Sequence, residues 1–216
     1  MKFVVRAKYL FIVLLFTGAC TKLDEKELLY DRVSSDNFPQ NEAEFVSVMA
    51  AAYTNLYASF GSDGNIMCLQ EVPSDEIVVP TRGPDWGDGG HWVRLKLHTY
   101  RANDPKMSGT WDFLFKGVST CNRVISTLEP LNTPLSQKFI SELRALRAIY
   151  YYWLLDMFGN VPISTDFSET EPLPNNTRQE VYAFVESELL AAIPDLQDTG
   201  PNDNATYLYG DRKSVV

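Results

Sequence analysis

A long and almost wholly apolar helix is predicted by residues 141–162, which read SELRALRAIYYYWLLDMFGNVP. Its second half carries only Arg147 and Asp156 as charged residues, and Gly159 is a residue type that commonly ends a helix. We expect the helix to cover residues 136–158, whose first residue is a serine suited to capping. Because a helix without a polar face is buried on several sides, this segment predicts the centre of a helical domain.

Three further helices are predicted around this one. Apolar residues recur at spacings of three and four over residues 41–61, 108–129 and 176–194. Thr177 and Glu180 have the spacing of a capping box at the start of the last helix. Helices of this length in hairpin-like order are typical of an all-α, tetratricopeptide-like helical repeat. In such an α-α superhelix each pair buries its apolar face against the next.

A long irregular loop excursion separates the first two helices. Residues 62–106 are rich in Gly, Asp, Pro and Trp and show no helical periodicity. A loop of this length inside a compact domain is usually either functional or disordered. Because Trp86, Trp92 and Tyr100 argue against disorder, we expect an ordered loop carried by the helical scaffold.

The N-terminus carries an export signal. Residues 1–19 combine a basic start, a short apolar run and small residues before Cys20. The apolar run is much shorter than the roughly 20 residues that a membrane-spanning helix needs. Cys20 therefore fits the lipidated first residue of a bacterial lipoprotein, with ordinary signal cleavage as the alternative. We divide the chain into a signal peptide at 1–19, a polar tether at 20–35 and a helical domain at 36–216.

The charge balance argues against one class of partner. The chain has 28 Asp and Glu against 19 Lys and Arg, which gives a formal net charge of -9. No basic cluster follows the first few residues. Because such a surface repels a phosphate backbone, nucleic-acid binding is not expected.

Residues 85–92, which read DWGDGGHW, form the favoured ligand-binding segment. Trp86 and Trp92 offer flat apolar faces to the C–H surfaces of sugars, and Asp85 offers acceptors for their hydroxyl groups. The alternative interpretation is that one or both indoles pin the loop to the helices. Calcium binding by Asp85 and Asp88 is a weaker alternative, because their spacing misses the EF-hand pattern.

Residues for catalysis are scarce. The sequence contains no nucleophile elbow, P-loop, dinucleotide fingerprint or HExxH helix. His91 and His98 lie in the excursion among several carboxylates, where they could serve a hydrolase or hold a metal. Because no metal-ligand spacing is matched, hydrogen bonds to the loop backbone are their favoured role. We therefore expect no catalytic residue, no metal site and no cofactor.

Two arginines on the apolar helix have a structural interpretation. Arg144 and Arg147 lie three residues apart, where a guanidinium packed on several sides needs a carboxylate. Asp156, Glu186 and Glu188 are the expected partners. Buried ion pairing is therefore favoured over anion binding.

The tyrosines and the remaining cysteines are also expected to be structural. Residues 150–152 are three consecutive tyrosines, which point in three directions around a helix and cannot form one stacking platform. Cys68 and Cys121 could pair in an oxidising compartment, but two separate buried thiols are the favoured interpretation.

The segment 141–162 resembles the most characteristic stretch of the SusD/RagB family. That stretch has an acidic residue, Arg and Leu-Arg-Ala, then aromatic residues and a Gly-Asn-Val-Pro-like turn. Other pieces follow in the family's order: the lipobox-like Cys20, Trp111 through Asn122, Ser74-Asp75-Glu76 with the Trp86–Trp92 loop, and Arg178 through Tyr182. Together they cover nearly the whole chain.

The resemblance implies a surface-exposed lipoprotein of the outer membrane in Bacteroidetes-like bacteria, with no catalysis of its own. Such proteins bind starch-like or other oligosaccharides, or peptides in RagB-like relatives, and pass them to a SusC-like TonB-dependent transporter. Their place in the loop implies Trp86, Trp92 and Asp85 as ligand residues. Because family members are longer, the helical domain is expected to be truncated at its C-terminal end. A helical-repeat adaptor that binds only protein is the alternative.

Overall fold

The computed structural model describes residues 38–57 and 65–196. Its helices all belong to the unit Pro39–Val216. They are α2 (Glu42–Tyr57), α3 (Asn65–Glu71), α4 (His91–Lys96), α5 (Pro105–Leu128), α6 (Pro134–Phe158) and α7 (Arg178–Ala192), with short 3-10 turns η1 (Asp88–Gly90), η2 (Glu129–Leu131) and η3 (Ile193–Asp195). No strand occurs in the described ranges, where Arg82 and Asp85 form an isolated bridge, so the all-α prediction is confirmed. The predicted signal peptide, Cys20 and tether lie outside the described residues.

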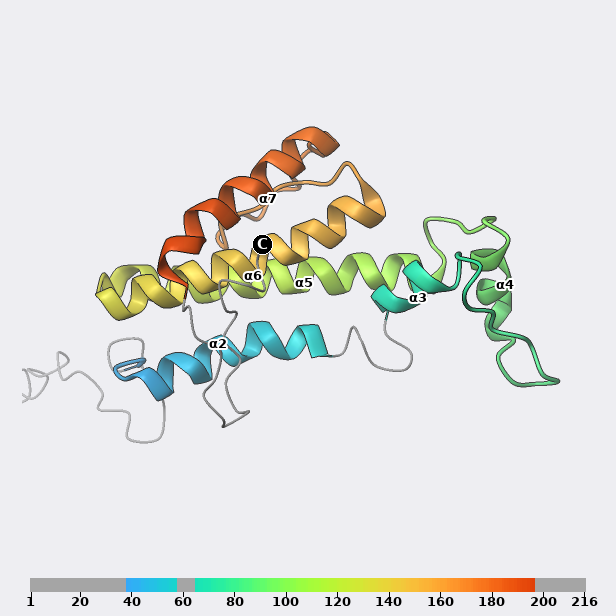
Figure 1. The fold of residues 1–216 in the computed structure, drawn as a ribbon, viewed down its shortest axis with the longest axis horizontal. Helices are drawn as coiled ribbons and strands as arrows, with labels where there is room; N and C mark the ends of the chain where they lie inside the picture. Colours follow the sequence, from blue (N-terminus) through green and yellow to red (C-terminus); the bar gives the residue numbers. More distant parts are fainter. Residues whose placement is uncertain (1–37, 58–64, 197–216) are drawn as a thin grey trace, which may run out of the picture. The chain divides into compact units, whose positions relative to one another are not determined.

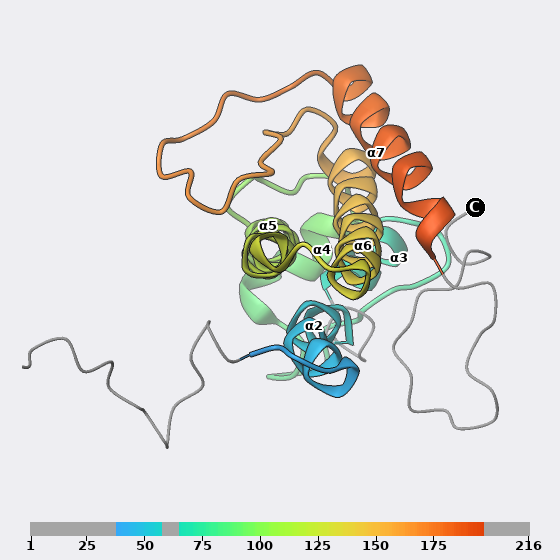
Figure 2. The same cartoon turned by 90° about the vertical axis from the view of Figure 1, so that its left-hand side faces the viewer.

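The helices α5 and α6 form the central pair of the fold. They lie side by side, with α2 packed on one side of the pair and α7 on the other (Figures 1 and 2). The short helix α3 packs against α5 and leads into the excursion that contains α4. The main core gathers fully buried apolar residues from the central helices, including Leu114, Val118, Leu143, Leu146 and Leu154. The prediction that the apolar helix 136–158 lies at the centre is confirmed.

Local capping explains where the long helices begin. Thr133 is the N-cap of α6: its hydroxyl accepts from the amide of Ser136, whose own hydroxyl accepts from the amide of Thr133. The helix therefore starts two residues before the predicted serine, with Pro134 in its first turn. Pro105 likewise starts α5 three residues earlier than predicted. Proline suits the first turn because it lacks the N–H group that would have no partner within the helix there.

The predicted capping box of α7 is present. The hydroxyl of Thr177 accepts from the amide of Glu180 at 3.3 Å, and Glu180 Oε2 accepts from the amide of Thr177 at 2.7 Å. These bonds to the amide and hydroxyl of Thr177 lower the pKa of the Glu180 carboxyl. The charged form of Glu180 is therefore the form that the folded helix favours.

We expect Thr177→Ala to destabilise the protein by about 1 kcal/mol, because an alanine N-cap leaves an amide of the first turn without its acceptor. Urea unfolding followed by circular dichroism measures this loss, with Ser187→Ala on the same exposed helix surface as the control. A carboxyl group whose pKa is lower in the folded than in the unfolded protein stabilises the fold at pH values above its unfolded pKa. That stabilisation is lost as the pH falls through the folded pKa. The difference between parent and variant should therefore narrow in acid, and a difference that widens would contradict the capping role.

The structure corrects the expectation that residues 62–106 lack helices. Two short helices, α3 with seven residues and α4 with six, lie inside this excursion. Neither is long enough to show a repeating apolar pattern. They pack around a second, smaller core made by Cys68, Val72, Trp92 and Leu95.

The buried arginine pairing is confirmed, with Glu188 of α7 as the partner. Glu188 Oε1 accepts from Arg144 Nη2 at 2.7 Å, and Glu188 Oε2 accepts from Arg147 Nη2 at 2.5 Å. Arg147 also donates to Asn122 Oδ1 at 2.7 Å, and Asn122 in turn donates to the carbonyl of Ser164 at 3.0 Å. One polar network thus joins α5, α6 and α7 inside the fold.

Two of the three tyrosines and both cysteines occupy buried structural positions, as predicted, whereas Tyr152 departs from the prediction. Tyr150 and Tyr151 are fully buried, whereas Tyr152 is exposed. Cys68 and Cys121 are separate buried thiols and form no disulfide. Burial raises the pKa of the Cys121 thiol to about 12, so this side chain is a neutral, apolar part of the core.

Candidate functional site

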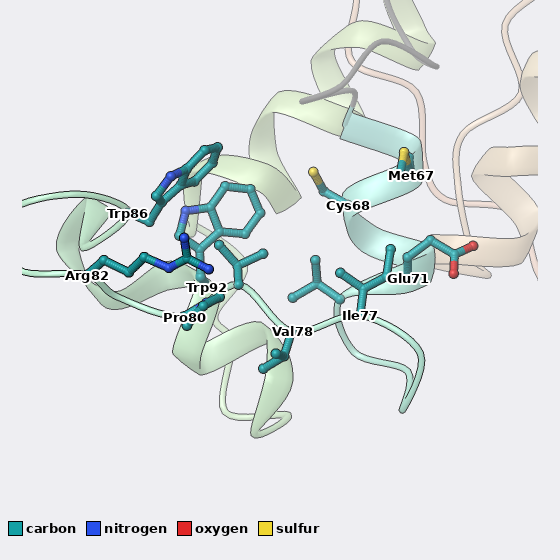
Figure 3. A pocket seen from close by; sticks show the side chains of 11 residues that line it. Met67, Cys68, Glu71, Ile77, Val78, Pro80, Arg82, Trp86 and Trp92 are labelled. Atoms are coloured by element: carbon teal, nitrogen blue, oxygen red, sulfur yellow. The ribbon is translucent and has the colours of Figure 1, made fainter.

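A pocket of about 280 Å³ opens beside the second core. Figure 3 shows Trp86 and Trp92 facing Met67 and Glu71 of α3 across it, with the segment 77–82 between them. The lining residues are Met67, Cys68, Glu71, Val72, Ile77, Val78, Val79, Pro80, Arg82, Trp86 and Trp92. The structure therefore places both sequence-predicted tryptophans at one cavity.

The two indoles have different roles in this pocket. Trp86 is 50% exposed, whereas Trp92 is 4% exposed and belongs to the second core. Their ring centroids lie 6.0 Å apart at an interplanar angle of 58°. Asp88 Oδ2 accepts a hydrogen bond from Trp92 Nε1 at 2.6 Å, which fixes the orientation of the buried ring. Trp86 is the indole that solvent reaches, and Trp92 lies beside it as a buried part of the pocket wall.

Asp85 shapes the loop through its backbone. Its amide and carbonyl exchange hydrogen bonds with the carbonyl and amide of Arg82, both at 3.0 Å. This tight turn brings the Arg82 side chain, rather than the Asp85 carboxylate, to the pocket lining. Sequence reasoning missed Arg82 and Glu71: a turn with no periodic pattern brings Arg82 to the lining, and Glu71 comes from α3, a separate segment of the chain.

The two histidines bond to loop backbone, as the structural interpretation predicts. His91 Nδ1 lies 2.6 Å from the carbonyl oxygen of Asp88, and His98 Nε2 lies 3.0 Å from that of Pro73. His91 is buried, whereas the ring of His98 is largely exposed. Across residues 38–57 and 65–196, no three His, Cys, Asp or Glu side chains gather in a group that could hold a metal ion.

Comparison with known proteins places this fold. The model of a SusD-like family, described as starch-binding and associating with the outer membrane, matches residues 23–207. The chain belongs to this SusD-like family. Two curated relatives from Bacteroides are similar to part of this chain. They are a SusD-like protein of Bacteroides ovatus, 26% identical over 191 residues, and the starch-binding protein SusD of Bacteroides thetaiotaomicron, 22% identical over 128 residues. These matches cover 74% and 59% of this chain, but only 35% and 22% of the relatives.

Solved structures of SusD-like proteins share the helical fold. A laminarin-binding SusD-like protein superposes with a TM-score of 0.67 at 24% identity, over 82% of this chain and 38% of that one. Surface glycan-binding protein A from Bacteroides uniformis gives a TM-score of 0.67 at 22% identity, over 81% of this chain and 40% of that one. The SusD-like chain thus spans well under half the length of these relatives, and the tetratricopeptide-like fold predicted from sequence is confirmed.

The membrane question has one structural answer. None of the helices in the described part of this SusD-like chain combines the length and the apolar character that a membrane span requires.

Proposed function

We propose that this SusD-like protein binds oligosaccharides at the Trp86 pocket and passes them to an outer-membrane transporter for nutrient uptake. The observation that carries the proposal is the half-exposed Trp86 indole, which stands at the mouth of an apolar pocket and rests against a second, buried indole. The exposed indole and the apolar lining together form one apolar surface, and apolar surfaces of this kind often mark ligand-binding sites.

The chemistry of the pocket suits one face of a sugar ring. The Trp86 indole can stack on C–H surfaces, while Arg82 and Glu71 at the lining can donate to and accept from hydroxyl groups. The volume of about 280 Å³ lies near the lower end of ligand sites, so the pocket would hold one unit of a longer chain. The family to which the chain belongs is described as starch-binding, and this supports capture rather than hydrolysis.

The names of related proteins support a glycan ligand. One curated relative is a starch-binding protein, one structural neighbour is a laminarin-binding SusD-like protein, and another is a surface glycan-binding protein. Which glycan this protein binds is therefore a question for a panel of probes, in which soluble starch and laminarin come first.

The proposal includes the location and the partner. A lipidated Cys20 would anchor the protein to the outer membrane, and residues 20–35 would tether the helical domain to the cell surface. A SusC-like TonB-dependent barrel would receive the captured ligand and perform the energised step. Co-purification of the protein with such a barrel from outer membranes tests this part separately from sugar binding.

Trp86→Ala is expected to weaken retention in native gels that contain soluble starch or laminarin, by about tenfold in apparent affinity if the lost aromatic contact contributes roughly 1.5 kcal/mol. Tyr182→Ala, which removes an exposed aromatic residue from α7, is the matched control and should migrate like the parent. The thermal midpoint of unfolding should be the same for all three proteins. If the gel retains the parent and retains Trp86→Ala to the same extent, the proposed site is wrong.

A peptide ligand is the second candidate, and the composition of the pocket favours it. Nine of the eleven lining residues are apolar, and only Glu71 and Arg82 are charged. Such a wall suits an apolar peptide side chain, with the two charged groups available to the peptide backbone or termini. Capture of peptides from a casein digest by the parent but not by Trp86→Ala, with no response to either polysaccharide, would select this candidate.

A further inference from the structure

The turn that presents Trp86 has a strained backbone. Trp86 and Asp88 both have positive φ angles, 59° and 36°, and Gly89 and Gly90 follow at 61° and 78°. Glycine adopts this region readily, whereas other residues do so rarely. Strain of this kind persists only where surrounding contacts hold it. The contacts that hold this turn therefore determine where the Trp86 indole stands.

Arg94 of α4 provides a contact to the middle of the turn. Its Nη1 donates a hydrogen bond to the carbonyl of Gly89 at 2.8 Å. The same Nη1 lies so near Gly90 that a Cβ atom there would be 3.3 Å away. Arg94 is not part of the pocket lining, and this hydrogen bond links it to the turn that carries Trp86.

Asp104 connects Arg94 to the helical scaffold. It is the N-cap residue of α5 and is 4% exposed. Its carboxylate accepts from Arg94 Nε at 2.9 and 3.0 Å and also from Arg94 Nη2, and it accepts from the amide of Arg101 at 2.8 Å. The hydrogen bond from Arg94, followed by that from the Arg101 amide, lowers the pKa of Asp104 to about 2. The carboxylate is therefore charged at any pH at which ligand binding is measured.

From this geometry we infer that Arg94 is a positioning residue for the ligand site: Asp104 holds it at the start of α5, and it fixes the turn 86–90, with its four positive φ angles, that presents Trp86. The inference rests on the binding role proposed for Trp86. A ligand that meets an indole already in place does not have to order the loop, and this raises its affinity. A lysine cannot replace Arg94, because one ammonium group lacks the planar fork that reaches a carboxylate and a carbonyl together.

The test uses the geometry of the indole pair and the affinity together. Two indoles 6.0 Å apart couple as an exciton pair in far-ultraviolet circular dichroism, and the parent spectrum minus that of Trp86→Phe isolates this band. Arg94→Ala and Arg94→Lys should each lose most of the band when the spectra are recorded at a temperature below the thermal midpoint of each variant. If the turn is then formed a tenth of the time, affinity for soluble starch or laminarin falls about tenfold. Arg123→Ala, which removes an exposed arginine from α5, should change neither signal.

Each outcome decides one part of the inference. If Arg94→Ala and Arg94→Lys keep the full exciton band, Arg94 does not position Trp86 and the inference fails, whatever the ligand result. If Arg94→Ala also loses its helical signal, this variant has unfolded, and the spectrum of Arg94→Lys alone decides whether Arg94 positions Trp86. Loss of the band with unchanged affinity in both variants also overturns the inference. If Trp86→Ala binds as the parent does, the proposed binding site fails, while the band still reports whether Arg94 holds the turn.

Discussion

Glu188→Ala is expected to destabilise the protein more than any other single change considered, by roughly 3–5 kcal/mol, the usual cost of breaking a buried ion pair. The side chains of Glu188 and Arg147 are only 7% and 6% exposed, and Glu188 also bonds to Arg144. Removal of this carboxylate leaves the buried Arg147 guanidinium, and the partly exposed one of Arg144, without their counter-charge. A urea titration should show a lower midpoint with an unchanged slope.

The control for this prediction lies on the same helix. Glu186→Ala removes an exposed carboxylate two residues away, and we expect a change within about 0.5 kcal/mol. Glu188→Gln keeps the shape and an acceptor oxygen, so its loss should be intermediate. If Glu188→Ala unfolds at the same urea concentration as Glu186→Ala, the network contributes no net stability.

Gly117→Ala is expected to destabilise the protein by about 1–3 kcal/mol or more, because the added methyl group has no space. A Cβ atom at Gly117 would lie 2.3 Å from Cε1 and 2.4 Å from Cζ of Tyr150. The Tyr150 ring cannot move away easily, since it is fully buried and its hydroxyl donates to the carbonyl of Ala52 at 2.7 Å. This contact sets how closely α5 approaches α6.

A double-mutant cycle with Tyr150→Leu tests the mechanism of that loss. Without the ring, alanine at position 117 should cost nothing and gain up to about 1 kcal/mol from its higher helix propensity. Ser119→Ala on the exposed side of α5 controls for propensity alone. An equal loss from Gly117→Ala in both backgrounds would show that the ring is not the obstacle.

The long helices were predictable from sequence because they depend on local pattern. The buried ion pairs were predictable because a buried charge needs an opposite charge beside it. The spacing of Thr177 and Glu180 encodes a cap, and an arginine such as Arg147 within an apolar helix needs a carboxylate. The candidate site was predictable only in part. Trp86 stands out in a glycine-rich loop, but Arg82 comes to the pocket through a tight turn and Glu71 through tertiary packing, and neither leaves a periodic pattern in the sequence.

The short helices were missed for a related physical reason. Helices of six or seven residues are too short to be stable alone, and tertiary contacts such as those of Trp92 and Leu95 hold them in place. Their sequence therefore carries little of the signal that long amphipathic helices show. The role of Arg94 was hidden likewise, because the contact between its guanidinium and the Gly89 carbonyl depends on a turn with positive φ angles.

The two separate cores allow the pocket and the helical framework to change independently during evolution. The small core around Trp92 carries the pocket wall, while the large core of α2, α5, α6 and α7 sets global stability. Substitutions in regions without shared partners have nearly additive effects on stability. Natural variation can therefore remodel the pocket, one residue at a time, while the helical framework stays above its stability threshold. Under the proposed function, a lineage that meets a new nutrient would change what the Trp86 pocket binds without rebuilding the helical framework.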